Sequence, residues 1–209
     1  MLNARTQRDL LRGPAGLLEV GLDEAAPGRP AQGLALVCHP HPLHGGTMDN
    51  KVVQTLARAF VQCGWTALRF NFRGVGASQG THDEGVGEAR DMQALIAQAA
   101  PEGPLALAGF SFGAFVATQV AASLWPVRPF ERLVLVGTAA SRFNVVALPP
   151  ECHERTLVVH GEADDTVPLS AVMDWARPQT LPVTVIPGGG HFFHGQLPLL
   201  KSLVVRHLS

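Results

Sequence analysis

The sequence Gly109-Phe110-Ser111-Phe112-Gly113 stands between two segments of different character. Residues 105–108 are wholly apolar, which predicts a short buried strand, and residues 112–123 are rich in Ala and Val, which predicts a helix. A tight turn between strand and helix needs small flanking residues, and its strained backbone lifts the serine hydroxyl clear of the sheet. The helix N-terminus behind it favours developing negative charge. Ser111 is therefore the candidate nucleophile.

Composition indicates one soluble domain spanning residues 1–209, since 46% of the 209 residues are hydrophobic and 16% are charged. The net charge of −1 gives no indication of a nucleic-acid partner, and no apolar run is long enough to insert into a membrane. The first nine residues are polar, so no secretory signal is expected. Three scattered cysteines predict free thiols in a reducing compartment, and we expect a cytoplasmic protein. These cysteines are Cys38, Cys63 and Cys152.

Short apolar segments alternate with helical segments along the chain, which predicts an α/β fold. Because each apolar segment is continuous, we expect a mainly parallel sheet of about eight strands with helices on both faces. Residues 9–12 and 16–22 predict an antiparallel N-terminal hairpin. Residues 138–155 contain prolines and no convincing long helix, so no large cap domain is expected. Further strands are predicted at 34–38, 65–72, 132–137, 156–160 and 182–186, and further helices at 50–63, 88–100, 169–176 and about 199–207.

Acidic and histidine residues follow two of these strands, and active groups gather at the carboxyl ends of strands in such sheets. His160-Gly161-Glu162-Ala163-Asp164-Asp165-Thr166-Val167-Pro168 follows one strand, and Gly188-Gly189-Gly190-His191-Phe192-Phe193-His194 follows the last. Nucleophile, acid and histidine in this order resemble the α/β-hydrolase superfamily. Further motifs resemble small bacterial serine hydrolases and esterases without a lid, similar to the dienelactone-hydrolase-like branch. They are His39-Pro40 with Gly45-Gly46 and Asn50-Lys51, Arg69-Phe70-Asn71-Phe72-Arg73-Gly74, and the phenylalanine pair after His191.

The resemblance implies that His191 is the general base, with His194 as the rival, and that Asp164 orients the imidazole. Asp165 and Glu162 remain alternatives for the acid. A second match to G-x-S-x-G surrounds Ser78, but it follows a loop and precedes no helix, so we interpret that serine as a polar turn residue.

An oxyanion hole needs two fixed backbone N–H donors. We expect Phe112 to supply one and His41 the other, because the prolines on either side of His41 have no N–H. The glycine-rich turn after Arg73 is interpreted as structural, with Arg73 bonding loop carbonyls. Histidines 39, 41, 44 and 82 do not follow metal-ligand spacing, so neither a metal nor a cofactor is expected.

The predicted function is hydrolysis of small to medium carboxylic esters or thioesters, with such a small molecule as the partner. The same catalytic residues could serve an amidase, a peptidase or a lactone hydrolase, and the fold could also serve as an inactive ligand-binding module. Composition leaves a monomer and a homodimer both open. The residues expected to line a substrate pocket are Trp125, Phe143, Trp175, Phe192, Phe193 and His194.

Overall fold

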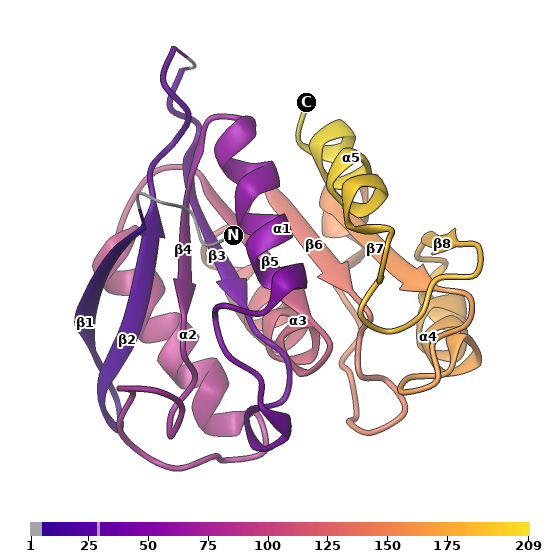
Figure 1. Ribbon diagram of the computed structural model, residues 1–209, viewed down its shortest axis with the longest axis horizontal. Coiled ribbons are helices and arrows are strands. Elements are labelled where there is room, and N and C mark those ends of the chain that lie inside the picture. The colour runs from indigo at the N-terminus through magenta and orange to yellow at the C-terminus, as the bar shows by residue number, and fades with distance from the viewer. Residues whose placement is uncertain (1–5, 29) are drawn as a thin grey trace.

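A single eight-stranded sheet forms the centre of the molecule, with strand order β1-β2-β4-β3-β5-β6-β7-β8 (Figure 1). The computed structural model describes residues 6–28 and 30–209. The first five residues of the polar N-terminal stretch, and residue 29 in the loop after the N-terminal hairpin, lie outside the described residues. The strands are β1 (Gln7–Gly13), β2 (Gly16–Asp23), β3 (Gly33–Cys38), β4 (Trp65–Phe70), β5 (Leu105–Phe110), β6 (Arg132–Val136), β7 (Thr156–Gly161) and β8 (Val183–Ile186).

The sheet is mostly parallel, as predicted. β1 pairs with β2 and β2 with β4 in antiparallel fashion, which confirms the N-terminal hairpin. The remaining neighbours, from β4 through β3 to β8, are parallel. The carboxyl ends of six strands therefore meet along one edge of the sheet, which is the edge where a site is expected.

Helices cover both faces of the sheet (Figure 1). α1 and α5 contact each other on one face, and α2, α3 and α4 pack on the other. The helices are α1 (Lys51–Gln62), α2 (Val86–Ala99), α3 (Phe112–Leu124), α4 (Leu169–Ala176) and α5 (Leu197–Leu208), with short 3-10 helices η1 (Pro42–His44), η2 (Pro150–Arg155) and η3 (Arg177–Gln179).

The continuous apolar strands serve two cores at once, because successive side chains of a strand point to opposite faces. On β5, Leu105 and Leu107 belong to the core under α2 and α3, whereas Ala106 and Ala108 belong to the core under α1 and α5. All four side chains are fully buried. The small residues on the second face let α1 approach closely. β5 is thereby fixed from both sides, and so is the turn that follows it.

Two local predictions need correction. α2 begins at Val86, two residues earlier than predicted, because the Glu88 carboxylate accepts a hydrogen bond from the Gly85 N–H and caps the helix. Among the described residues no loop carbonyl accepts a hydrogen bond from Arg73; its guanidinium instead donates two hydrogen bonds of 2.7 Å to the Asp91 carboxylate. This buried ion pair ties the glycine-rich loop to α2.

The chain between β6 and β7 forms turns and the short helix η2, in agreement with the expectation that no lid lies there. Its apolar side chains Val145 and Leu148 pack into the core under α3. Within residues 6–28 and 30–209, no helix combines the length and the apolar character that a bilayer crossing requires.

Candidate active site

Ser111 lies at the predicted turn between β5 and α3, with φ 57° and ψ −116°. Such a backbone conformation is strained for a residue with a side chain. A Cβ on Gly109 would lie 2.1 Å from the Gly113 carbonyl oxygen, and a Cβ on Gly113 would lie 2.5 Å from the carbonyl oxygens of Cys38 and His39. Both glycines are therefore required for β5, α3 and the end of β3 to meet. The packing that excludes larger residues also holds the serine in its strained conformation.

Three loops bring a hydroxyl, an imidazole and a carboxylate together. The Nε2 atom of His191 lies 3.0 Å from the Ser111 hydroxyl oxygen, and its Nδ1 atom lies 2.7 Å from a carboxylate oxygen of Asp164. Because the carboxylate can only accept, Nδ1 carries the proton and Nε2 is free to accept from the serine hydroxyl. All three residues are less than 10% exposed. The alternatives Asp165 and Glu162 make neither of these contacts.

Asp164 is held by its own loop as well as by His191. One carboxylate oxygen accepts hydrogen bonds from the backbone N–H groups of Thr166 at 3.0 Å and Val167 at 2.7 Å. Burial disfavours the charged carboxylate, but the hydrogen bonds from His191 and the Val167 amide outweigh burial and hold the pKa of Asp164 below its usual value. The carboxylate is therefore ionised at neutral pH and fixed in orientation.

His160 is a neighbour of Asp164 that the sequence prediction did not assign to the site. Its Nε2 atom lies 2.8 Å from the Val167 carbonyl oxygen, to which it donates, and 3.4 Å from the Asp164 carboxylate. Burial lowers the pKa of His160, so its ring is neutral. A histidine four residues before the acid, at the end of a buried strand, was the available sequence signal.

The loop after β3 carries the second predicted oxyanion donor, His41. The neighbouring His39 is fully buried; its Nδ1 donates to the Pro40 carbonyl oxygen at 2.6 Å, and its Nε2 accepts from the Phe72 N–H at 3.0 Å. Burial lowers the pKa of His39 to about 4, so the neutral ring persists. Phe112, the other predicted donor, is the first residue of α3, and the first amides of a helix have no partner within it.

A cavity of about 240 Å³ opens beside Ser111. Both predicted oxyanion residues, His41 and Phe112, line it together with His191. Two of the predicted pocket residues, Phe143 and Phe192, also line it. The ring of Phe143 stacks on Phe115 with centroids 4.6 Å apart, so this wall of the cavity is anchored in the core.

The other four predicted pocket residues lie elsewhere, which corrects that part of the prediction. Trp125 follows the last residue of the thirteen-residue helix α3 and packs on Phe130, about 20 Å along the helix from Ser111. Trp175 on α4 donates its indole N–H to the Val146 carbonyl oxygen. Phe193 is fully buried under α1 and α5, and His194 lines a neighbouring hollow.

The second G-x-S-x-G serine has a structural role. The Ser78 hydroxyl donates to the Asn71 carbonyl oxygen at 2.7 Å and accepts from the Glu19 N–H at 2.9 Å. Ser78 is thus a buried turn residue that joins the loop after β4 to β2. Across the part of the chain that the structure describes, no three His, Cys, Asp or Glu side chains are grouped so that they could hold a metal ion.

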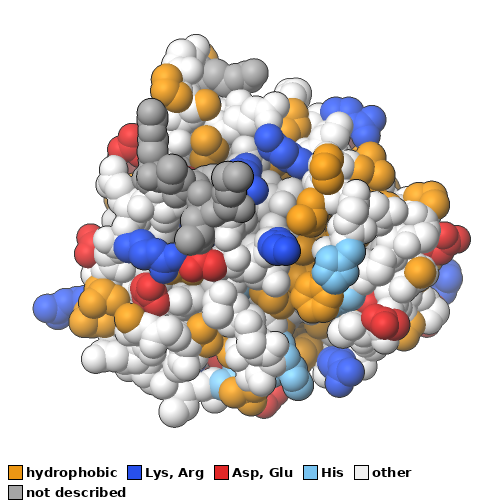
Figure 2. All heavy atoms as spheres, in the orientation of Figure 1, with side chains coloured by type: hydrophobic (Ala, Val, Ile, Leu, Met, Phe, Trp, Pro, Cys, Tyr) orange, Lys and Arg blue, Asp and Glu red, His pale blue; other side chains and the backbone are white. Residues whose placement is uncertain are grey.

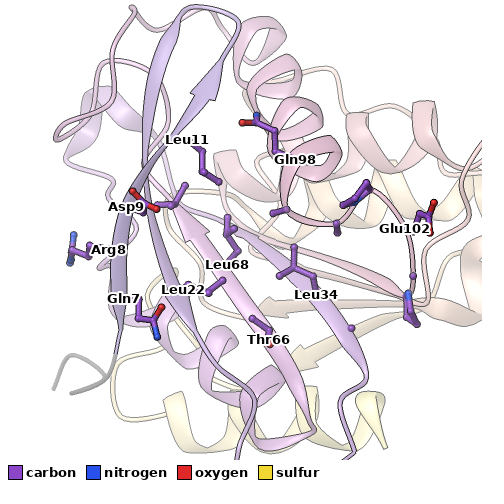
Figure 3. Close-up of a pocket in the computed structure, with 17 residues that line it drawn as sticks. Gln7, Arg8, Asp9, Leu11, Leu22, Leu34, Thr66, Leu68, Gln98 and Glu102 are labelled. Atoms are coloured by element: carbon purple, nitrogen blue, oxygen red, sulfur yellow. The ribbon is translucent and has the colours of Figure 1, made fainter.

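A larger cavity, of about 650 Å³, lies between β1–β4 and the end of α2 (Figure 3). Leu11, Leu22, Leu34 and Leu68 line it (Figure 3). Gly33 and Pro104 place it at the amino ends of β3 and β5, whereas Ser111 follows the carboxyl end of β5. None of the described residues that line this larger cavity is a serine, cysteine or histidine, whereas the smaller cavity contains Ser111 and His191.

Comparison with known proteins agrees with this geometry. The family described as serine aminopeptidase, S33, matches residues 41–150. The uncharacterized protein RP471 of Rickettsia prowazekii is 34% identical over 192 residues, which cover 87% of this chain and 79% of that protein. The chain therefore belongs to the family described as serine aminopeptidase, S33, within the α/β-hydrolase superfamily.

Two solved structures share both sequence and fold with this chain. XC6422 from Xanthomonas campestris, described as an α/β serine hydrolase without a lid, is 36% identical with a TM-score of 0.87. The match covers 100% of this chain and 95% of the XC6422 chain. An α/β serine hydrolase homologue from Coxiella burnetii is 38% identical with a TM-score of 0.86, covering 100% and 99%. The predicted superfamily and lidless group are confirmed: this protein is a serine α/β hydrolase without a lid.

Proposed function

We propose that this hydrolase cleaves small to medium carboxylic esters or thioesters through an acyl-enzyme on Ser111. The observation that carries the proposal is the chain of two contacts from Ser111 through His191 to Asp164, at 3.0 and 2.7 Å. The site therefore has the order of groups that nucleophilic acyl transfer requires.

In the first half-reaction, the Ser111 hydroxyl oxygen bonds to the acyl carbon while its proton passes to Nε2 of His191. Asp164 stabilises the resulting imidazolium, and the backbone N–H groups of His41 and Phe112 stabilise the negative oxygen of the tetrahedral intermediate. The bond to the leaving group then breaks. His191 returns the proton to the departing alkoxide or thiolate.

In the second half-reaction, water attacks the acyl-enzyme and gives its proton to His191. The tetrahedral intermediate collapses, the carboxylic acid departs, and Ser111 regains its proton from Nε2. Ser111, His191 and one water molecule account for every bond and proton in these two half-reactions. A small-molecule substrate and a cytoplasmic location, where the cysteines would stay reduced, complete the proposal.

The size of the site supports small to medium substrates. Its cavity of about 240 Å³ is below the range of about 300–1,000 Å³ that holds drug-sized ligands. Between β6 and β7 the described chain offers turns and η2 in place of a helical cap over long acyl chains. Short acyl groups are therefore expected to react faster than long ones.

A second candidate is cleavage of amides or peptides, which the description of the matching family as a serine aminopeptidase favours. An aminopeptidase must bind the positive N-terminal amine of its substrate. None of the described residues that line the cavity carries a carboxylate, and Arg142 adds a positive charge. This charge distribution disfavours a cationic substrate, so the ester or thioester is preferred.

A series of p-nitrophenyl esters tests the proposal, with alanine p-nitroanilide as the aminopeptidase probe. We expect kcat/KM to be highest for acetate or butyrate, to fall for octanoate and palmitate, and to vanish in Ser111→Ala. Val127→Ala, at an exposed site beyond α3, is the matched control and should behave as wild type. Faster turnover of palmitate, or of the anilide, would contradict the proposed substrate class.

A further inference from the structure

Arg142 stands on the wall of the active-site cavity, on the turn that follows β6. The turn is closed by hydrogen bonds of 3.1 Å from the N–H groups of Arg142 and Phe143 to the Ala139 carbonyl oxygen. The next side chain, Phe143, stacks on Phe115 and contacts Phe112 edge to face. The backbone at Arg142 is therefore fixed, while the residue itself is exposed.

Arg142 is the only Lys, Arg, Asp or Glu among the described residues that line this cavity. Three histidines, His41, His44 and His191, also line it, and burial and neighbouring histidines lower the pKa of His41, which keeps that ring neutral. The Asp164 carboxylate lies behind His191 and is occupied by its hydrogen bonds. The cavity thus has one fixed charge, which is positive.

Within residues 6–28 and 30–209, no carboxylate forms an ion pair with the Arg142 guanidinium. Other arginines of the chain differ: Arg73 pairs with Asp91, and Arg155 pairs with Glu131 at 2.8 Å. A guanidinium presents a planar set of donors that matches a carboxylate. An unpaired guanidinium beside a nucleophile is therefore available to a substrate anion.

The hollow next to the active-site cavity adds a second basic side chain. It shares Gly45, Asn50 and Phe192 with the active-site cavity and adds Lys51 and His194. The one carboxylate among its described lining residues, Asp49, is already bonded to Arg8 at 2.6 Å and to Arg69 at 3.0 Å. Figure 2 shows histidine and hydrophobic side chains together on one face of the molecule, with basic and acidic side chains around them. Among the described residues that line the two cavities, Arg142 and Lys51 are thus the charged side chains that no ion pair offsets.

We propose that the natural substrates carry a carboxylate in addition to the scissile ester or thioester, and that Arg142 binds this carboxylate. Arg142 is a specificity residue and takes no part in the chemistry. The inference depends on the proposed esterase or thioesterase activity and narrows its substrate class. The carboxylate can belong to the acyl part or to the leaving group, and both are served by the same guanidinium.

Two substrate pairs distinguish a carboxylate on the acyl part from a carboxylate on the leaving group. In the first, the mono-p-nitrophenyl ester of adipic acid is compared with p-nitrophenyl hexanoate; in the second, 4-acetoxybenzoate is compared with its methyl ester. For wild type we expect the anionic member of at least one pair to have the higher kcat/KM, mainly through a lower KM. A hydrogen bond to a charged group corresponds to a factor of about 10 to 100, so Arg142→Gln should reduce the anionic-to-neutral ratio by that factor.

Arg90→Gln is the matched control, because it also removes one exposed positive charge but lies on α2 away from the cavity. Its anionic-to-neutral ratio should stay within about twofold of wild type, and melting temperatures should show that both variants fold. A wild-type ratio below one in both pairs, or an unchanged ratio in Arg142→Gln, would overturn the inference. If wild type hydrolyses neither member of either pair, the proposed function fails instead, so the two failures are distinguishable.

Discussion

Replacing Ser111 by glycine should stabilise the protein relative to replacement by alanine. At φ 57° and ψ −116°, a residue with a Cβ is strained by about 1–3 kcal/mol, and glycine removes this strain. The greater freedom of the unfolded chain lowers the stability of the glycine variant by about 0.4–1 kcal/mol relative to the alanine variant. Both variants lose the hydrogen bond to His191, so that contribution cancels. The expected net advantage of glycine is about 1 kcal/mol.

Urea unfolding of the two variants, followed by circular dichroism, measures this difference directly. In thermal unfolding, 1 kcal/mol corresponds to about 2 °C for a chain of this size. Ala117→Gly, within α3 and fully buried, is the control. Its free energy of unfolding should be lower than that of wild type by at least about 1 kcal/mol. If the Ser111→Gly variant is less stable than Ser111→Ala, the backbone at this position stores no strain, and the reasoning is refuted.

Three further predictions concern the acid, the buried histidine and the ion pair. Asp164→Asn should lower kcat by about 10³- to 10⁴-fold with little change in KM, because an amide favours the wrong tautomer of His191; steady-state kinetics on p-nitrophenyl butyrate check this. The pKa of His39 is lowered to about 4, so the unfolded state takes up its proton first, and stability falls as pH drops from about 6.5 towards 4. Between pH 7 and 4.5, wild type should therefore lose about 2 kcal/mol more than His39→Gln in urea unfolding, and equal losses would disprove the assignment. Arg73→Met leaves the buried Asp91 carboxylate without its partner and should cost about 3 kcal/mol, part of which Asp91→Leu should restore in the double variant. A double variant no more stable than the single one would contradict that interpretation.

The architecture and the three central residues could be predicted because they depend on strand ends. A run of apolar residues defines a buried strand, and in a parallel sheet the next few residues must emerge at one edge. Ser111, Asp164 and His191 each follow such a run within five residues. Their convergence is then a consequence of topology, and the hydrogen bonds at 3.0 and 2.7 Å agree with it.

The walls of the cavity could not be predicted in the same way, because they depend on local backbone angles. Phe192 and Phe193 are adjacent in sequence, yet Phe192 is 44% exposed at the cavity and Phe193, with φ 51°, turns into the core under α1 and α5. Trp125 illustrates a different limit: α3 begins at the site but carries its far end about 20 Å away. Aromatic composition near a site in sequence therefore says little about which rings line it.

Arg142 was missed for a related reason. It lies in a proline-containing segment without periodicity, and only the hydrogen bonds of its turn place it on the cavity wall. The sequence shows neither that the turn closes on Ala139 nor that no carboxylate of the described residues pairs with the guanidinium. A lone basic residue in an irregular loop gives no signal by itself.

The reactive serine can be identified most directly by the mass of the covalent adduct formed with a fluorophosphonate probe. Wild type and Ser78→Ala should each gain one probe, and peptide mapping should find it on residue 111. His191→Ala should react far more slowly, because nothing then accepts the hydroxyl proton. An adduct on Ser111→Ala, or no adduct on folded wild type, would contradict the assignment of the nucleophile and of the relay behind it.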